Sequence, residues 1–200
     1  MIGILAMQGA VQPHRAKFSK LGIETLAVRY EAELSHCQGL VLPGGESSTV
    51  LKLLHDYGLW EPLIEFSDSK PVWGVCAGAI LMADRVANPS QEALGLLPVS
   101  VERNAYGRQN ESFITSVPLS IPGKTSELSE AVFIRAPKIT EWDQSLTVLA
   151  TYEGLPVALQ DGRHLMTTFH PELSNSTVLH HHFSLLCGHT PAAIQKQASG

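Results

Sequence analysis

The sequence predicts an α/β fold, a three-layer sandwich with helices on both faces of a mostly parallel central sheet. Apolar runs at residues 2–7, 39–42 and 71–75 have the length and composition of buried strands. Each run leads through a turn into a segment with helical features, and such alternation favours parallel pairing. Beyond residue 92 the pattern changes to successive strand-like runs, which predicts a small antiparallel region beside the main sheet.

The composition fits one globular domain, with 44% hydrophobic and 16% charged residues among 200. The net charge of −5 and a pI near 6.0 give no reason to expect a nucleic-acid partner. No apolar run approaches the length of a membrane span, and the N-terminus lacks the positive start of a signal peptide. We expect residues 1–188 to form a single domain and residues 189–200 to form a flexible tail.

The chain contains three cysteines, Cys37, Cys76 and Cys187. An odd number without C-x-x-C spacing argues against a disulfide framework and against a zinc site. A reducing, cytoplasmic location fits this usage and would keep a reactive thiol available.

Helices and strands alternate regularly over the first half of the chain. We expect strands at 2–7, 24–29, 39–42 and 71–75, and helices at 13–21, from the turn after Leu42 through Leu54, at 60–66 and at 77–83. In the second half we expect strands at 94–102, 112–119, 132–137, 146–152, 157–160 and 164–169, and a closing helix at 173–187. The strands at 94–102 and 112–119 are expected to form an antiparallel hairpin through residues 103–110.

Cys76 lies between a strand and a helix, within Gly-Val-Cys-Ala-Gly. This pattern is typical of a nucleophile elbow, in which small neighbours accommodate a strained turn. The turn lifts the sulfur to the carboxyl edge of the sheet, next to the free amides of a helix start. The alternative is a structural cysteine in a core strand.

A glycine pair follows the strand at 39–42, in Pro-Gly-Gly-Glu-Ser-Ser-Thr. Ser47 or Ser48 can cap the next helix, and free amides beside two glycines suit an anion or an oxyanion. The alternative is an ordinary loop with a good cap. The segment is not a P-loop, because the Gly-Lys-Ser/Thr ending is absent.

The last strand ends in Phe-His-Pro-Glu, at residues 169–172. Pro171 stiffens the exit and fixes His170 at the strand edge, where Glu172 can orient the imidazole. The alternative is a strand-end histidine followed by an acid favoured by a helix dipole. We interpret the histidines at 180–182 as helix surface and packing, because a metal site would require i, i+4 spacing.

Cys76, His170 and Glu172 occur in an order that suits a nucleophile, a base and an orienting acid. The amides of Gly45 and Ala77 precede helices at the same sheet edge and could form an oxyanion hole. The set therefore predicts acyl transfer through a thioester.

The motifs at 43–47, 74–78 and 169–172 together resemble those of class I, triad-type glutamine amidotransferases. Segments 6–11, 101–109 and 133–137 resemble the subfamily that provides the glutaminase subunits of pyridoxal 5′-phosphate synthases. The resemblance extends from residue 2 to about residue 187. Departures from the usual pattern are mild: Val75 replaces a threonine, and Ala6-Met7 replaces Gly-Leu.

The resemblance implies a role for individual residues. Cys76 would be the nucleophile, His170 the base and Glu172 the third member of the triad, with no cofactor and no metal. The residues that would hold L-glutamine are Gly45, Glu46, Ser47, Arg103, Ile134 and Arg135. Gln8 would lie near an oxyanion site that is completed when the synthase subunit docks, and this subunit would receive the ammonia.

Docking could act by reorienting the Gly44–Gly45 peptide, and His14 and Arg15 are expected to be exposed candidates for the contact. The sequence leaves two alternative functions. One is a glutaminase for histidine or purine synthesis, against which the segment at 103–109 argues. The other is a non-catalytic regulatory subunit, against which the intact triad argues.

Overall fold

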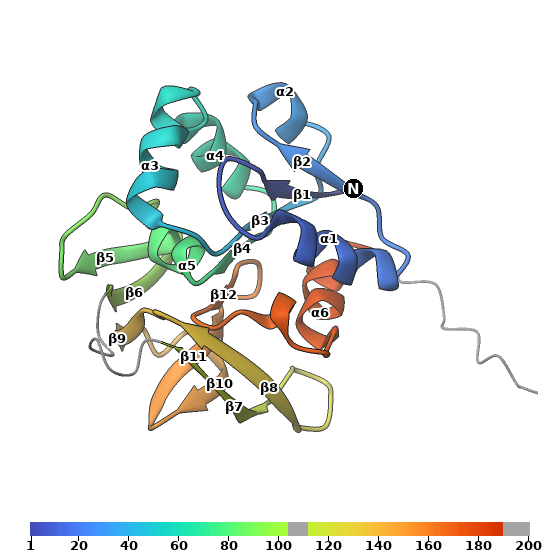
Figure 1. The fold of residues 1–200 in the computed structure, drawn as a ribbon, viewed down its shortest axis with the longest axis vertical. Coiled ribbons are helices and arrows are strands. Elements are labelled where there is room, and N and C mark those ends of the chain that lie inside the picture. Colours follow the sequence, from blue (N-terminus) through green and yellow to red (C-terminus); the bar gives the residue numbers. More distant parts are fainter. Residues whose placement is uncertain (104–111, 190–200) are drawn as a thin grey trace, which may run out of the picture.

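The computed structural model describes residues 1–103 and 112–189, which form an α/β fold (Figure 1). The α/β class expected from the sequence is confirmed. The predicted connection at 104–110 and the predicted tail from residue 190 lie outside the described residues.

The first half alternates strands and helices, as expected. Its elements are β1 (Ile2–Leu5), α1 (Val11–Lys20), β2 (Thr25–Val28), α2 (Glu31–Leu34), β3 (Gly39–Leu42), α3 (Ser47–Asp56), α4 (Trp60–Ser67), β4 (Val72–Val75) and α5 (Ala77–Met82). The short helix α2 was not predicted, because four residues are too few to show a helical period.

The second half is mostly strands. Its elements are β5 (Ala83–Ala87), β6 (Leu97–Glu102), β7 (Ser112–Leu119), β8 (Glu127–Ile134), β9 (Lys138–Trp142), β10 (Thr147–Tyr152), β11 (Leu155–Gln160), β12 (Leu165–Thr167), the 3₁₀ turn η1 (Pro171–Leu173) and α6 (Val178–Leu186). The expected helix at 173–187 is wrong in its first part, since η1 and an irregular segment precede α6.

The described strands form a nine-stranded sheet in the order β2-β1-β3-β4-β12-β11-β10-β7-β8. From β2 to β12 the neighbouring strands are parallel. From β12 to β8 they are antiparallel. The sheet is therefore mixed, and its antiparallel part is larger than the sequence suggested.

A second sheet, in the order β5-β6-β9, lies beside the main one. It corrects one expectation: the strands at 94–102 and 112–119 do not pair as a hairpin. β6 pairs with β5 and β9, whereas β7 belongs to the main sheet and pairs with β8 and β10. One partner of each strand, β9 for β6 and β10 for β7, comes from a distant part of the chain, which periodicity does not encode.

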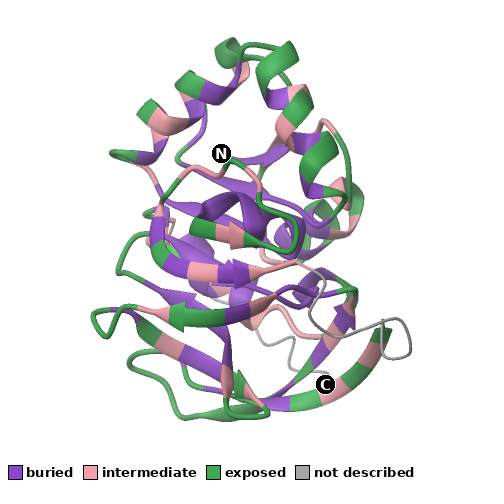
Figure 2. Ribbon diagram, turned by 90° about the vertical axis from the view of Figure 1, so that its left-hand side faces the viewer, coloured by how far each residue is buried: buried purple, intermediate pink, exposed green. Residues whose placement is uncertain are grey.

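Side chains alternate between two hydrophobic cores across the parallel strands. Leu40, Leu42 and Val72 face the core that includes α3, α4 and α5. Val41 and Trp73 face the opposite core, which includes α1 and α6. Figure 2 shows the strands between these layers as largely buried. Both faces of the parallel half are thus covered, which explains its uninterrupted apolar runs.

The described residues contain no helix that is long and apolar enough to cross a membrane.

Candidate active site

Four adjacent parallel strands, β1, β3, β4 and β12, bring most of the predicted site residues to one edge of the sheet. The other three are Arg103, which follows β6, and Ile134 and Arg135 at the end of β8. A pocket of about 330 Å³ opens at this edge. Apart from Gln8, every residue predicted for the site lines it: Gly45, Glu46, Ser47, Cys76, Ala77, Arg103, Ile134, Arg135, His170 and Glu172. Four others complete the lining: Ala10, Gly44, Ile80 and Leu173. Carboxyl ends of parallel strands are the usual place for a ligand in such sheets.

Cys76 has the strained backbone of an elbow, with φ 50° and ψ −100°. It is the N-cap of α5, and its N–H donates to the Thr167 carbonyl at 2.9 Å. The glycines on either side permit a close approach of backbones. A Cβ at Gly74 would lie 2.5 Å from the Gly78 carbonyl oxygen, and one at Gly78 would lie 2.0 Å from that of Leu42. No larger residue fits either position without displacing backbone.

The Cys76 sulfur is buried but faces the pocket, and it lies 3.7 Å from the Ile134 carbonyl oxygen. The other two cysteines are also free and buried. Burial raises the pKa of the Cys37 thiol, and it raises that of Cys187 to about 12. Neither of these two is among the residues that line the pocket.

His170 and Glu172 form a short hydrogen bond between Nδ1 and Oε1, at 2.7 Å. Both side chains are buried. A Cβ at Gly44 would lie 2.3 Å from the His170 ring. The loop that contains Gly44 and Gly45, here called the glycine loop, therefore packs directly on the imidazole. Because Nδ1 is engaged by Glu172, Nε2 is the nitrogen of His170 that is left to exchange a proton with the Cys76 sulfur.

Burial alone would lower the pKa of His170, but hydrogen bonds and charge interactions with Cys76 and Glu172 raise it to about 10. Burial alone would raise the pKa of Glu172. Its hydrogen bond with His170 and the proximity of His14 and His170 instead lower that pKa. Both shifts favour an imidazolium beside a carboxylate, so His170 is well suited to hold a proton taken from a nearby thiol.

Glu46 caps α3, which corrects the expectation that Ser47 or Ser48 does so. Its carboxylate accepts from the Thr49 N–H at 2.7 Å and from the Ser48 N–H at 3.4 Å. Partial burial acts to raise the pKa of Glu46, but hydrogen bonds from Ser48 and Thr49 lower it to about 2. Arg103 Nη2 donates to Glu46 Oε1 at 3.0 Å, so one wall of the pocket carries a fixed charge pair.

Ile134 is the last residue of β8 and Arg135 follows it, and both line the pocket. Arg135 has a positive φ of 43°, a second strained residue at the site. The structure thus places strained backbone at both Cys76 and Arg135.

Gln8 does not line the pocket, but it contacts the loop that does. Its Oε1 accepts from the Glu46 N–H at 3.0 Å. A Cβ on the neighbouring Gly9 would lie 1.9 Å from the Gly44 carbonyl oxygen. The end of β1 is therefore in direct contact with the glycine loop.

The expectation that His14 is exposed is wrong, because His14 is fully buried while Arg15 is exposed. His14 shares a face of α1 with Phe18, four residues on, and this face packs on the sheet. The i, i+4 spacing of His14 and Phe18 is the sequence feature that indicates the burial of His14. His180 and His182 are buried in α6, as packing residues.

Among the described residues, no group of three His, Cys, Asp or Glu side chains could hold a metal ion.

Comparison with known proteins gives one consistent result. Residues 4–187 match the family described as "SNO glutamine amidotransferase family". The chain is 47% identical over 183 residues to a protein of Thermotoga neapolitana named "Pyridoxal 5′-phosphate synthase subunit PdxT", covering 91% of this chain and 96% of the relative. A protein of the same name from Solibacter usitatus is 46% identical over 186 residues, covering 90% and 95%.

A solved structure described as "Crystal structure of glutamine amidotransferase" is also similar. It superposes with a TM-score of 0.86 at 39% identity, covering 94% of this chain and 98% of the other.

The buried neutral histidines predict how stability depends on pH. Burial lowers the pKa of His14 from 6.5 to about 4, and it lowers that of His180 as well. Below pH 6.5 the unfolded chain therefore binds protons that the folded protein excludes, so the free energy of unfolding falls between about pH 6.5 and 4. His14 alone contributes about 3 kcal/mol to this fall. Urea unfolding at several pH values measures it. The fall should be smaller in His14→Gln, and an unchanged pH dependence would contradict the assignment.

Proposed function

Because the chain belongs to the SNO glutamine amidotransferase family, we propose that Cys76, His170 and Glu172 act as its catalytic triad. The chain is a glutamine-hydrolysing enzyme and the glutaminase subunit of a pyridoxal 5′-phosphate synthase, because its family is one of glutamine amidotransferases and its relatives are named as subunits of that synthase. One observation carries the triad: a strained cysteine at the pocket, beside a histidine held by a buried glutamate.

The first half of the reaction forms a thioester. Cys76 gives or shares its thiol proton with His170, and the sulfur attacks the side-chain amide carbon of glutamine. The C–N bond then breaks as His170 returns a proton to the leaving nitrogen, which departs as ammonia. Glu172 keeps Nδ1 of His170 engaged, so that its other nitrogen handles the proton.

The second half consumes water. His170 takes a proton from a water molecule, whose oxygen attacks the thioester carbon. The C–S bond breaks, glutamate leaves and the Cys76 sulfur regains its proton. Glutamine plus water thus gives glutamate plus ammonia, and the enzyme returns to its starting state.

The oxyanion formed in both halves would be held by the amides of Gly45 and Ala77. Ala77 is the first residue of α5, and amides of a first helical turn have no partner within the helix. Gly45 precedes the N-cap of α3. Loss of one such donor lowers kcat by about 10²–10³.

Charges at the pocket would hold the rest of glutamine. Glu46 would attract the α-ammonium group, while Arg103 and Arg135 suit the α-carboxylate. Ser47 and the backbone at Ile134 complete this proposed substrate site. The ion pair of Arg103 with Glu46 supports the assignment, because it fixes a donor and an acceptor on one wall.

We also propose three features of the whole protein: its domain organisation, its layers and its location. Residues 1–188 form a single domain, in line with the family match over 4–187. The layers form a three-layer sandwich, supported by cores on both faces of the parallel strands. The enzyme acts in the cytoplasm, where reducing conditions would keep the free Cys76 thiol usable.

A glutaminase for histidine or purine synthesis is disfavoured by the names of these relatives. A non-catalytic subunit is disfavoured by the family, which is one of glutamine amidotransferases.

The nucleophile is tested by Cys76→Ala and Cys76→Ser. Both should abolish ammonia release from glutamine while the fold survives, because the sulfur forms the covalent intermediate. Cys187→Ala, which changes a thiol outside the pocket, is the matched control and should keep its turnover. Near-normal turnover in Cys76→Ala would disprove the triad.

The substrate site is tested by Arg135→Ala. Loss of a charge-assisted hydrogen bond is worth about 1.5–3 kcal/mol, so kcat/KM should fall at least about tenfold. Arg85→Ala removes an arginine paired with Glu141 outside the pocket and should leave the kinetics unchanged. Normal kinetics in Arg135→Ala, Arg103→Ala and Glu46→Gln alike would place the substrate elsewhere.

The last test concerns activation. Free ammonia is wasteful, so we expect slow hydrolysis by the isolated chain and faster hydrolysis with the synthase subunit of the same organism. Docking would turn the Gly44–Gly45 peptide so that its amide faces the oxyanion, which suffices for about 10²–10³ in kcat. Gln8, which holds the Glu46 N–H, would transmit the contact. Gln8→Ala should reduce the response, and equal rates with and without the synthase subunit would refute the switch.

A further inference from the structure

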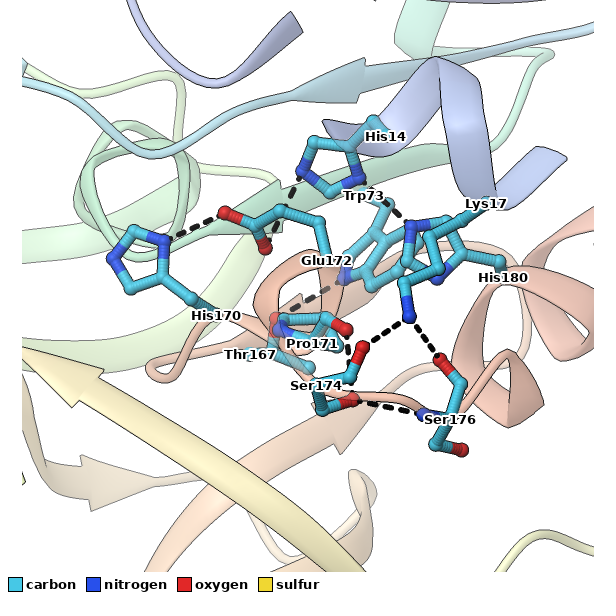
Figure 3. Close-up of polar contacts among 10 residues, drawn as sticks. All are labelled: His14, Lys17, Trp73, Thr167, His170, Pro171, Glu172, Ser174, Ser176 and His180. Carbon is cyan, nitrogen blue, oxygen red and sulfur yellow. Dashed lines mark hydrogen bonds and ion pairs between the residues drawn. The ribbon is translucent and has the colours of Figure 1, made fainter. Parts of the chain in front are cut away.

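Behind the proposed triad, a chain of buried polar side chains runs away from the pocket into the core (Figure 3). Glu172 has two carboxylate oxygens, and His170 uses only Oε1. Oε2 points the other way, toward Nε2 of His14 in α1, at 3.6 Å. Both side chains are fully buried, so water does not solvate this face of the carboxylate.

The two facing atoms are unpaired. Within the described residues, Glu172 Oε2 and His14 Nε2 are buried and have no hydrogen-bond partner. A buried polar atom without a partner carries a penalty that the protein normally avoids. The 3.6 Å separation needs to shorten by only about 0.7 Å to reach an ordinary hydrogen bond.

The second histidine decides which nitrogen of His14 carries the proton. His14 Nδ1 lies 2.9 Å from Nε2 of His180, so one of the two donates to the other. If His14 Nδ1 donated, its Nε2 would present a lone pair to the carboxylate. His180 would then keep its proton on Nδ1, as a buried donor without a described partner. If His180 Nε2 donates, His14 carries its proton on Nε2, facing Glu172, and the clash of a lone pair with the carboxylate disappears. His180 Nδ1 then carries no proton, so what stays unpaired there is an acceptor of a neutral ring rather than a donor.

The surroundings hold these rings in place. His180 packs edge-on against Trp73 and Phe18, with ring centroids 4.9 and 5.0 Å away. His14 packs edge-on against Trp73 at 5.6 Å. Complete burial also lowers the pKa of His14 to about 4, so the ring is neutral at physiological pH and has one N–H to place.

A neighbouring contact fixes α1 to the segment that follows Glu172. Lys17, one turn after His14, donates from Nζ to the carbonyl oxygens of Ser174 and Ser176. Two side chains of α1 therefore reach η1 and the residues after it, and the backbone that carries Glu172 is tied to this helix.

We infer that His14 is a positioning residue of the glutaminase, which donates from Nε2 to Glu172 Oε2 and so holds the carboxylate that orients His170. The inference rests on the proposed triad. His14 touches neither glutamine nor the sulfur and is absent from the pocket lining. It acts through Glu172 by fixing one oxygen while the other engages His170.

Two substitutions at this position separate the hydrogen bond from packing. The amide nitrogen of Gln can occupy the position of Nε2 and donate to Glu172, whereas that of Asn reaches only the position of Nδ1. Phe18→Leu is the packing control, because it disturbs the same aromatic cluster without removing a polar group. Glutamine hydrolysis is measured for the full chain together with the synthase subunit, as kcat and KM.

His14→Asn should lower kcat about tenfold and leave KM within about twofold, because orientation of His170 matters for bond breaking rather than for binding. His14→Gln should recover most of kcat, and Phe18→Leu should retain it at a comparable loss of thermal stability. Equal kcat values in His14→Asn and His14→Gln, or an equal loss of kcat in Phe18→Leu, would overturn the inference. His14 would then be a packing residue only.

His180 provides a second route if His14→Asn does not fold. His180→Leu removes the donor that sets the His14 tautomer and should lower kcat at unchanged KM, while His180→Gln should restore it. Normal kcat in His180→Leu would refute the hydrogen-bonded chain from His180 through His14 to Glu172 as a determinant of activity. Cys76→Ala, run alongside, separates the two proposals: activity in that variant refutes the triad, whereas inactive Cys76→Ala with normal His14 variants refutes only the role of His14.

Discussion

The parallel hydrogen bonding of β1, β3, β4 and β12 is the constraint on which the site depends. Strands that run in one direction end at one edge, so the segments that follow them meet there. Register matters as much as direction. Thr167 pairs with Val75, and a slip of one residue would turn the following side chains to the opposite face. The sheet therefore determines both that Cys76 and His170 meet and on which side they do so.

A second constraint is the burial of a negative charge. Glu172 is nearly inaccessible to water, and a carboxylate in such surroundings is tolerated only when its oxygens have partners. His170 provides one partner, and His14 faces the other oxygen. The polar chain thus links the outer pocket with α1 and α6, whose other buried residues include the apolar side chains Phe18, Leu179 and Phe183. Buried networks of this kind specify one arrangement of side chains, because each member has few alternatives.

The parts of the site that depend on local chemistry could be predicted from the sequence. The small neighbours of Cys76, the glycine pair and the His-Pro-Glu ending are each legible within a few residues, and the pocket brings all three together. Strand pairing and capping, which depend on contacts beyond the local pattern, could not be predicted. The pairing of β6 with β9 needs residues from another part of the chain. Glu46 rather than Ser47 caps α3 because the helix begins at Ser47 and the Glu46 carboxylate reaches forward to the amides of Ser48 and Thr49, which propensity alone does not reveal.

The three sulfurs of the chain differ in a way that has practical value. Cys37 and Cys187 are buried, and the raised pKa of each keeps it in the protonated, unreactive form at neutral pH. Of the three, only Cys76 lines the pocket of the candidate active site. An electrophile of modest size would therefore attach at a single place, so its stoichiometry would count competent molecules in a preparation. A fluorescent or isotopic tag could be installed there without first removing any other cysteine.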